Sequence, residues 1–287
     1  MPELIAGKVV VLTDLVRRVL APNPNIMTGP GTNTYLIGRD DIAVLDPGPD
    51  DSEAHLDAVA RAGGGRIRWI LVTHTHSDHS PGAAGLKERT GAEVLGYDER
   101  DGFAPDRTIG DGHVVADDVQ RFRLRAVHTP GHASNHLCYL LDRERILFSG
   151  DHIMSGSTVV IAPPDGDMAT YLKSLAIVAG LDAATIFPGH GDVIDDAKGK
   201  IEEYTTHRLA REAEVAAHLA ASPAPLSVEQ LVAAIYVGVI PELHPIAQFS
   251  AWAHLRKLTA DGRARPATGD IDSLDATWVG VRPGHVE

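Results

Sequence analysis

The sequence predicts a layered α/β fold followed by a small winged-helix module, and three observations support this prediction. Short β-branched or aromatic runs broken by turn residues fill residues 14–46 and indicate strands. Helical patterns then alternate with short apolar runs as far as residue 187, as expected of stacked layers of helix and sheet. After residue 191 the chain changes to helical patterns that end in two short β-like pieces.

The composition is that of an ordinary globular protein and excludes several function classes. The 287 residues are 44% hydrophobic and 23% charged, which permits a large core and argues against disorder. A formal charge of −13 disfavours non-specific binding to nucleic acid. Cys138 is the only cysteine, so an internal disulfide and a thiolate-rich zinc site are excluded. No segment looks like a membrane span or a signal peptide, so we expect a cytoplasmic protein with no membrane partner.

The elements of the first domain follow from local signals. Asp50, Asp51 and Ser52 offer an N-cap and an acidic first turn for a helix over residues 54–62, which the glycines at 63–65 end. Residues 67–72 form a continuous apolar run, typical of a buried strand. The same reasoning predicts helices over residues 82–90 and 168–181, strands over 92–96, 119–125 and 185–187, and a hairpin of 137–141 with 146–149. In the strand over 119–125, Arg121, Arg123 and Arg125 share one face, which we interpret as the solvated side.

The second domain begins after a long polar helix over about residues 197–221. A cluster of Ser, Pro and Ala follows it, so we assign residues 1–221 to the first domain and 222–287 to a winged-helix-like domain. Ser227 and Gln230 form a capping box for a helix to about residue 237. A third helix over 244–260 is followed by β-like pieces at 263–267 and 277–281. Residues 240–243 and the apolar third helix are candidates for a homodimer surface.

A dense group of potential metal ligands follows the strand over residues 67–72. It reads Thr73-His74-Thr75-His76-Ser77-Asp78-His79. Imidazole and carboxylate are the ligands that Zn²⁺ takes where no thiolate is available. Alternating His74 and His76 can point to one ion, while Asp78 and His79 are turned toward a neighbouring position. The spacing therefore predicts two adjacent metal ions.

Four further loop residues complete the pattern, each after a predicted strand and beside glycine or proline: Asp46, His132, Asp151 and His190. Taken singly, each has an equally good interpretation as a cap or turn residue. Taken together and in this order, they point to one site.

These residues match all five sequence motifs of the metallo-β-lactamase superfamily, which the chain resembles over about residues 14–195. The resemblance implies an α+β fold, the four-layer αβ/βα sandwich. It implies that His74, His76 and His132 bind one metal ion, and that Asp151 bridges this ion to a second. It assigns the second ion to Asp78, His79 and His190. Class B β-lactamases usually hold Cys at the position of Asp151, so the chain is more similar to other hydrolase branches.

Two residues are expected to support the ligands without binding metal. The resemblance implies that Asp46 holds the ligand loop through hydrogen bonds. His136, four residues past His132, has a similar interpretation, and an ordinary packed or surface histidine is the alternative. We expect two Zn²⁺ per chain, although sites of His and carboxylate also accept Fe or Mn.

A narrower resemblance concerns nearly the whole chain. Gly31-Thr32-Asn33-Thr34-Tyr35-Leu36, the stretch from Thr129 to His136, Ser149-Gly150-Asp151, and His207-Arg208 before a winged-helix tail are similar to the lactamase-beta-2-like family. Members of that family include RNA endonucleases, and close relatives hydrolyse thioesters of acyl carriers. The resemblance therefore implies a hydrolase more firmly than it implies a substrate.

The predicted mechanism is attack by a metal-bridging hydroxide. Metal binding lowers the pKa of water from about 15.7 to about 7, and two ions can hold the nucleophile while polarising the substrate. We assign Asp78 as the catalytic residue that orients this water or receives its proton. The acidic charge balance favours a small acyl substrate, namely a thioester, lactone or related ester.

Two other functions stay open. An endoribonuclease that cleaves single-stranded RNA would use cations of the tail, and these lie near a single acid, Asp261: Arg256, Lys257, Arg263 and Arg265. A solvated helix end is the plainer interpretation of these cations. A non-enzymatic binding protein with structural metal is disfavoured, because structural zinc sites close with four ligands around one ion.

Overall fold

The computed structural model describes residues 4–117 and 122–281, and the chain divides into two compact units. Unit 1 comprises Met1–Thr129, Asn135–Val159 and Ile177–Lys200, and unit 2 comprises Pro130–Ser134, Val160–Ala176 and Ile201–Glu287. Each unit has an apolar core of its own.

The larger sheet of unit 1 contains seven strands within the described residues, and their spatial order follows the sequence. Neighbours from β1 to β4 are antiparallel, and those from β4 to β7 are parallel. The strands are β1 (Val9–Val11), β2 (Val16–Leu20), β3 (Asn33–Ile37), β4 (Ile42–Leu45), β5 (Ile67–Leu71), β6 (Glu93–Gly96) and β7 (Arg107–Thr108). The opening β region and the buried strand near residues 67–72 are thereby confirmed.

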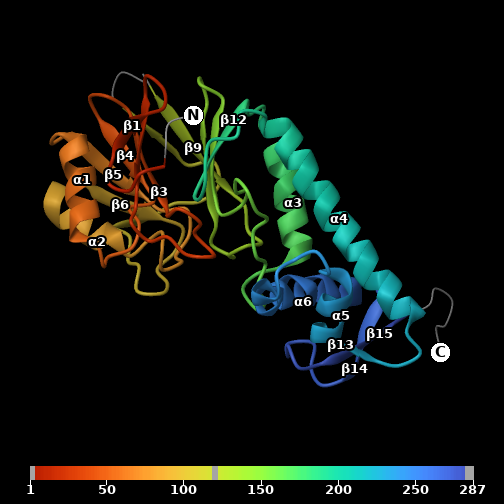
Figure 1. Cartoon of the computed structure of the whole chain (residues 1–287). Coiled ribbons are helices and arrows are strands. Elements are labelled where there is room, and N and C mark those ends of the chain that lie inside the picture. Colours follow the sequence, from red (N-terminus) through yellow and green to blue (C-terminus); the bar gives the residue numbers. More distant parts are fainter. Residues whose placement is uncertain (1–3, 118–121, 282–287) are drawn as a thin grey trace. The chain divides into compact units, whose positions relative to one another are not determined.

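Helices α1 (Glu53–Gly63) and α2 (Gly82–Thr90) cover one face of this sheet (Figure 1). The Ser52 hydroxyl accepts a hydrogen bond from the His55 amide and caps α1, while Gly64 ends the helix in the left-handed region at φ 58°. Both helices were expected, and these signals predicted α1. Leu56 and Val59 of α1 pack on apolar residues of the sheet.

The second sheet of unit 1 has, in the described part of the chain, the order β12-β11-β10-β9-β8. Its strands are β8 (Val114–Ala116), β9 (Arg123–His128), β10 (Leu137–Leu141), β11 (Ile146–Gly150) and β12 (Thr185–Pro188). The predicted hairpin is present, with Tyr139 of β10 opposite Phe148 of β11. A core between the two sheets includes Tyr35, Leu71, Tyr139 and Phe148.

The strand predicted over residues 119–125 ends later than expected. Residues 118–121, and with them Val119 and Arg121, lie outside the described residues. Strand β9 continues to His128, because Ala126 and Val127 are buried and pair with β10. Arg123 and Arg125 both form ion pairs with Asp142, at 3.5 and 3.3 Å, which fits a solvent-facing side.

Helices α3 (Met168–Ala179) and α4 (Ala197–Ala221) each contribute residues to both units. The remaining elements of unit 2 are β13 (Leu226–Ser227), α5 (Val228–Ile235), the 3₁₀ helix η1 (Pro241–Leu243), α6 (His244–Ala260), β14 (Ala264–Thr268) and β15 (Thr277–Gly280). Strand β15 lies between β13 and β14, and both pairings are antiparallel. The predicted capping box is present, since Ser227 and Gln230 each bond the other's amide.

The core of unit 2 corrects one expectation about partners. The apolar residues of α6 were a candidate homodimer surface, but Trp252, Leu255 and Leu258 are buried against Leu231 and Trp278. They fill the core because α6 packs against α5 and β14. Ile240, in the other part of the candidate surface, is 57% exposed.

Candidate metal centre

The His-rich run lies in the loop between β5 and α2, where a buried strand ends. The amides of His79 and Ser80 donate hydrogen bonds to the His76 carbonyl, at 3.0 and 3.2 Å, so the run folds into a tight turn. His74 and His79 are buried, whereas Asp78 is half-buried with 24% of its side chain exposed. The turn therefore presents several ligand groups at one strand end.

Asp151 and His190 reach the same place from the ends of β11 and β12. Gly189 precedes His190, and a Cβ atom at this glycine would lie 2.8 Å from both Asp151 Oδ1 and His79 Cε1. Glycine is therefore needed for the close approach of these ligands. Gly191, after His190, takes φ 81°, which completes the turn.

The Nε2 atoms of His79 and His190 lie close to each other and to one oxygen each of Asp78 and Asp151. His79 Nε2 lies 3.3 Å from His190 Nε2, 3.4 Å from Asp78 Oδ2 and 3.4 Å from Asp151 Oδ1. His190 Nε2 lies 3.1 Å from Asp78 Oδ2 and 3.3 Å from Asp151 Oδ1. Ligand bonds of about 2.0–2.1 Å in tetrahedral geometry place neighbouring donor atoms about 3.3 Å apart. These residues fit a metal ion.

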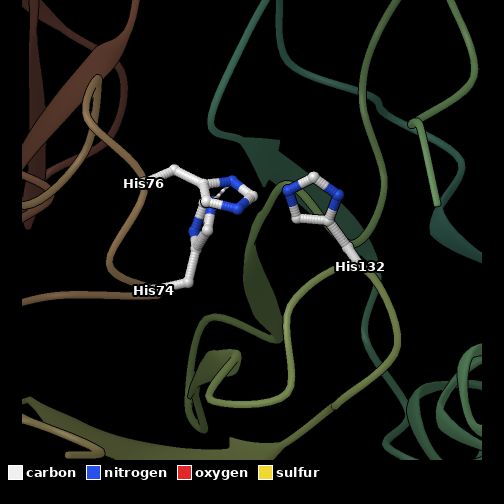
Figure 2. Close-up of side chains that lie close together, drawn as sticks. All are labelled: His74, His76 and His132. Carbon is white, nitrogen blue, oxygen red and sulfur yellow. Dashed lines mark hydrogen bonds between the residues drawn. The ribbon is translucent and has the colours of Figure 1, made fainter. Parts of the chain in front are cut away.

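A second group consists of His74, His76 and His132. Their ligand nitrogens all lie within 4.8 Å of one another, and Figure 2 shows the three rings gathered together. His74 Nε2 lies 2.9 Å from His76 Nδ1. His74, His79 and Asp151 form a third such group, which links the other two. The seven predicted ligands thus fall into two adjoining clusters.

In four histidines a hydrogen bond places a ring proton on Nδ1, so that Nε2 is the nitrogen that would bind a metal ion. The Nδ1 of His132 donates to the Val160 carbonyl at 2.7 Å, and that of His190 donates to the Gly31 carbonyl at 3.1 Å, because a carbonyl can only accept. The Nδ1 of His79 likewise donates to Asp46 Oδ2 at 2.9 Å. The Nδ1 of His74 contacts the hydroxyl of Thr73.

Thr73 connects Asp46 to His74. The Thr73 hydroxyl donates its single proton to Asp46 Oδ2 at 2.9 Å, so it accepts from His74 Nδ1 at 3.0 Å. The Thr73 amide donates to Asp46 Oδ1 at 2.8 Å. Asp46 thus orients His74 and His79 together, in agreement with the role expected for it. Thr73 was not among the residues predicted to support the site, and its only signal in the sequence was its position directly before His74.

His136 contacts the backbone of Asp151. The Asp151 amide donates to His136 Nε2 at 3.2 Å, so the proton of His136 is on Nδ1, which lies 2.9 Å from the Thr129 hydroxyl. The His136 ring is buried, with its centroid 5.1 Å from that of His74. This placement fits a support for Asp151 better than a ligand.

The carboxylates favour positive charge at the centre. Burial alone would lower the pKa of His79, but Asp78, Asp151 and Asp46 outweigh it and raise the pKa well above its usual value. Against the same effect of burial, Asp151 and Asp78 raise the pKa of His190 to about 9. Burial works to raise the pKa values of Asp78 and Asp151, yet the two histidines hold both below the usual range. A buried position that stabilises a proton in this way also suits a cation.

The basic residues of the tail are neutralised more fully than the sequence indicated. Asp261 is not the single acid near them, because buried Glu212 of α4 pairs with Lys257 at 3.0 Å and with Arg263 at 2.8 Å. Lys257 also pairs with Asp261 at 2.7 Å, and Arg256 pairs with Asp272. Arg265 is exposed and takes part in none of these ion pairs. The four cations therefore do not form a free basic surface.

Comparison with known proteins matches both domains. The model of the metallo-beta-lactamase superfamily matches residues 27–190, and that of the beta-lactamase associated winged helix domain matches residues 227–278. The chain is 36% identical over 276 residues to a Beta-lactamase-like protein 2 homolog of Drosophila melanogaster, covering 88% of this chain and 91% of that protein. It is 35% identical over 226 residues to the Thioesterase pkgB of Emericella nidulans, covering 77% and 62%.

A solved structure supports the fold. The beta-lactamase domain protein from Burkholderia ambifaria superposes with a TM-score of 0.79 at 21% identity, covering 96% of this chain and 94% of that one. The predicted fold and the winged helix are thereby confirmed. Among residues 4–117 and 122–281, no helix combines the length and apolarity needed to cross a membrane.

Proposed function

Because the chain belongs to the metallo-β-lactamase superfamily and is a metal-dependent hydrolase, we propose that it holds two zinc ions and cleaves a small acyl substrate. The substrate would be a thioester, a lactone or a related ester. The observation that carries this proposal is the position of His79 Nε2 and His190 Nε2, which lie 3.3 Å apart and 3.1–3.4 Å from Asp78 Oδ2 and Asp151 Oδ1. The adjoining cluster of His74, His76 and His132 would hold the other ion, with Asp151 between the two.

Bound metal ions would supply water of lowered pKa and would polarise the substrate carbonyl. The residues of the chain would orient the attacking water and accept its proton. Asp78 is the most exposed of the three carboxylates, with 24% of its side chain exposed against 11% for Asp151 and 2% for Asp46. Its Oδ2 faces His79 and His190. Because Asp78 is also the carboxylate that solvent reaches most easily, we assign to it the orientation of the attacking water and the acceptance of its proton.

A loop beside His190 supports an acyl substrate. The stretch from Asn23 to Gly31 is braced by its own side chains, since Asn25 Oδ1 accepts from the Met27 and Thr28 amides at 2.7 and 3.1 Å. This bracing leaves Ile26 58% and Met27 45% exposed. The loop ends at Gly31, whose carbonyl holds His190. Two exposed apolar side chains on a loop that reaches the centre suit an acyl chain better than a phosphodiester.

The relative named as a thioesterase points to the same substrate class. The alternative, an endoribonuclease, loses support from the ion pairs of Arg256, Lys257 and Arg263 with nearby carboxylates. For the domains, we propose that residues 1–221 form the hydrolase domain and residues 222–287 the winged-helix domain. The match of the winged-helix model to residues 227–278 supports this division.

The test is hydrolysis of an acyl-thioester panel beside single-stranded RNA, using the zinc-loaded protein. We expect thioester cleavage, and we expect Asp78→Asn to lower turnover by about 10²–10⁴-fold at equal metal content. Asp182→Asn is the matched control, because Asp182 is 83% exposed and pairs with Arg145 on the surface. Unchanged turnover in Asp78→Asn would refute the role of Asp78. RNA cleavage that Asp78→Asn abolishes, with no thioester cleavage, would favour the ribonuclease.

A further inference from the structure

His55 is a buried histidine that the proposed chemistry does not use. It lies in the first turn of α1, is 1% exposed and belongs to none of the ligand clusters. Its Nε2 lies 3.0 Å from the hydroxyl of Thr34 on β3. Its Nδ1 is buried and finds no hydrogen-bond partner among the described residues. The only side chain with which it shares a hydrogen bond in that part of the chain is therefore Thr34.

The direction of this hydrogen bond can be assigned. The Thr34 hydroxyl has one proton and donates it to the Asp46 carbonyl at 2.7 Å. His55 Nε2 must then be the donor to Thr34. Burial lowers the pKa of His55 to about 4. At neutral pH the ring therefore stays neutral, with its proton on Nε2.

The backbone amide and the backbone carbonyl of Asp46 both form hydrogen bonds. Its amide donates to the Leu71 carbonyl at 2.9 Å, and its carbonyl accepts from Thr34. Its φ is 51°, in the left-handed region that non-glycine residues seldom adopt, so neighbouring groups must fix it there. In this conformation the Asp46 carboxylate reaches Thr73 and His79.

From these contacts we infer that His55 is a positioning residue of the metal centre, acting through Thr34 on Asp46 and through Asp46 on His79. Because His55 donates to the Thr34 hydroxyl, the proton of that hydroxyl points toward the Asp46 carbonyl. Without that donor the hydroxyl can turn to other acceptors and the hold on Asp46 weakens. The inference rests on the proposed function, because it takes His79 to be a metal ligand.

The test compares zinc affinity and the absorption spectrum of the cobalt-substituted protein across matched variants. His55→Phe keeps a ring but removes the donor, whereas His55→Gln supplies an amide donor. We expect His55→Phe to weaken zinc binding by about tenfold and to shift the cobalt bands, as loss of hydrogen bonds outside the ligand shell does. We expect His55→Gln to recover most of the affinity. Val59→Ala, in the core face of the same helix, controls for general loosening and should leave the cobalt spectrum unchanged.

A double-mutant cycle tests the route through Thr34. Thr34→Val removes the hydroxyl, and adding His55→Phe to it should weaken zinc binding little further, because both changes break one chain of contacts. Additive losses would overturn the route. Equal zinc affinity and equal cobalt spectra in the wild-type protein and His55→Phe would overturn the inference itself. Failure of the wild-type protein to bind zinc would instead refute the proposed function, so the two failures can be told apart.

Discussion

One buried histidine of unit 1 and one of unit 2 are surrounded by charges of opposite sign. His79 of unit 1 contacts Asp46, Asp78 and Asp151, which raise its pKa. His254 of unit 2 is fully buried, and burial, followed by the charges of Arg208, Lys257, His207 and Arg211, lowers its pKa to about 3. The imidazole of His79 is thus placed where a cation is stabilised, whereas that of His254 stays neutral.

This difference teaches how to recognise a metal centre among buried histidines. Burial by itself disfavours the charged imidazolium, so a lone buried histidine becomes a neutral core residue. Close carboxylates reverse the effect, and in this protein they follow the ends of β4, β5 and β11. The sign of the neighbouring charges, more than the presence of histidine, identifies the site.

The largest expected effect comes from removing a carboxylate from the centre. Asp151→Ala removes one of the three carboxylates that contact His79 and one of the two that contact His190. We expect zinc affinity to fall by more than about a hundredfold, because Asp151 would contact the metal directly and even outer hydrogen bonds contribute about 10–100-fold. Titration of the metal-free protein with zinc measures this change. Retained affinity would contradict the comparison, and exposed Asp182→Ala should behave as wild type.

A smaller effect concerns the acid stability of unit 2. Because the pKa of His254 is lowered from 6.5 to about 3, the unfolded chain binds a proton that the folded one does not between these pH values. Its stabilising contribution is complete above about pH 6.5 and is lost as the pH falls toward 3. Between pH 7 and pH 4 this loss is on the order of 3 kcal/mol. His254→Leu should lose correspondingly less stability over that interval.

Urea unfolding of metal-free wild type and His254→Leu at both pH values measures the difference. Lowered pKa values elsewhere, including that of His55, affect the two proteins alike and cancel. An equal loss of unfolding free energy in both proteins would show that His254 is not held neutral.

The smallest effect is expected at the exposed cation of the tail. Arg265 takes part in none of the ion pairs that neutralise Arg256, Lys257 and Arg263. Arg265→Ala should change thioester turnover by less than about twofold, as exposed substitutions generally do. Filter binding should show weak affinity for single-stranded RNA in both proteins. Tight RNA binding that Arg265→Ala weakens would give unit 2 a function that its ion pairs argue against.

Structural features made by residues close together in the chain could be predicted from the sequence. The capping box of Ser227 and Gln230 involves residues three apart, and the turn from His74 to His79 gathers its ligands within six positions. These arrangements depend on local backbone geometry, which a short pattern specifies. The caps of α1 at Ser52 and Gly64 belong to the same class.

Contacts between distant residues could not be predicted in this way. Glu212 pairs with Lys257 and Arg263, and His55 with Thr34, only because the fold brings different elements together. The burial of Trp252 and Leu255 likewise depends on the packing of α5 and β14 against α6. Strands β7 and β13 are two residues long and carry no periodic signal.

The most direct test of the central claim is a zinc titration of the metal-free protein with thioester hydrolysis as the readout. Turnover should be absent without metal and should reach its plateau at two equivalents of zinc per chain. Full turnover in the presence of a chelator, or a plateau at one equivalent, would contradict a dinuclear centre built from the two clusters.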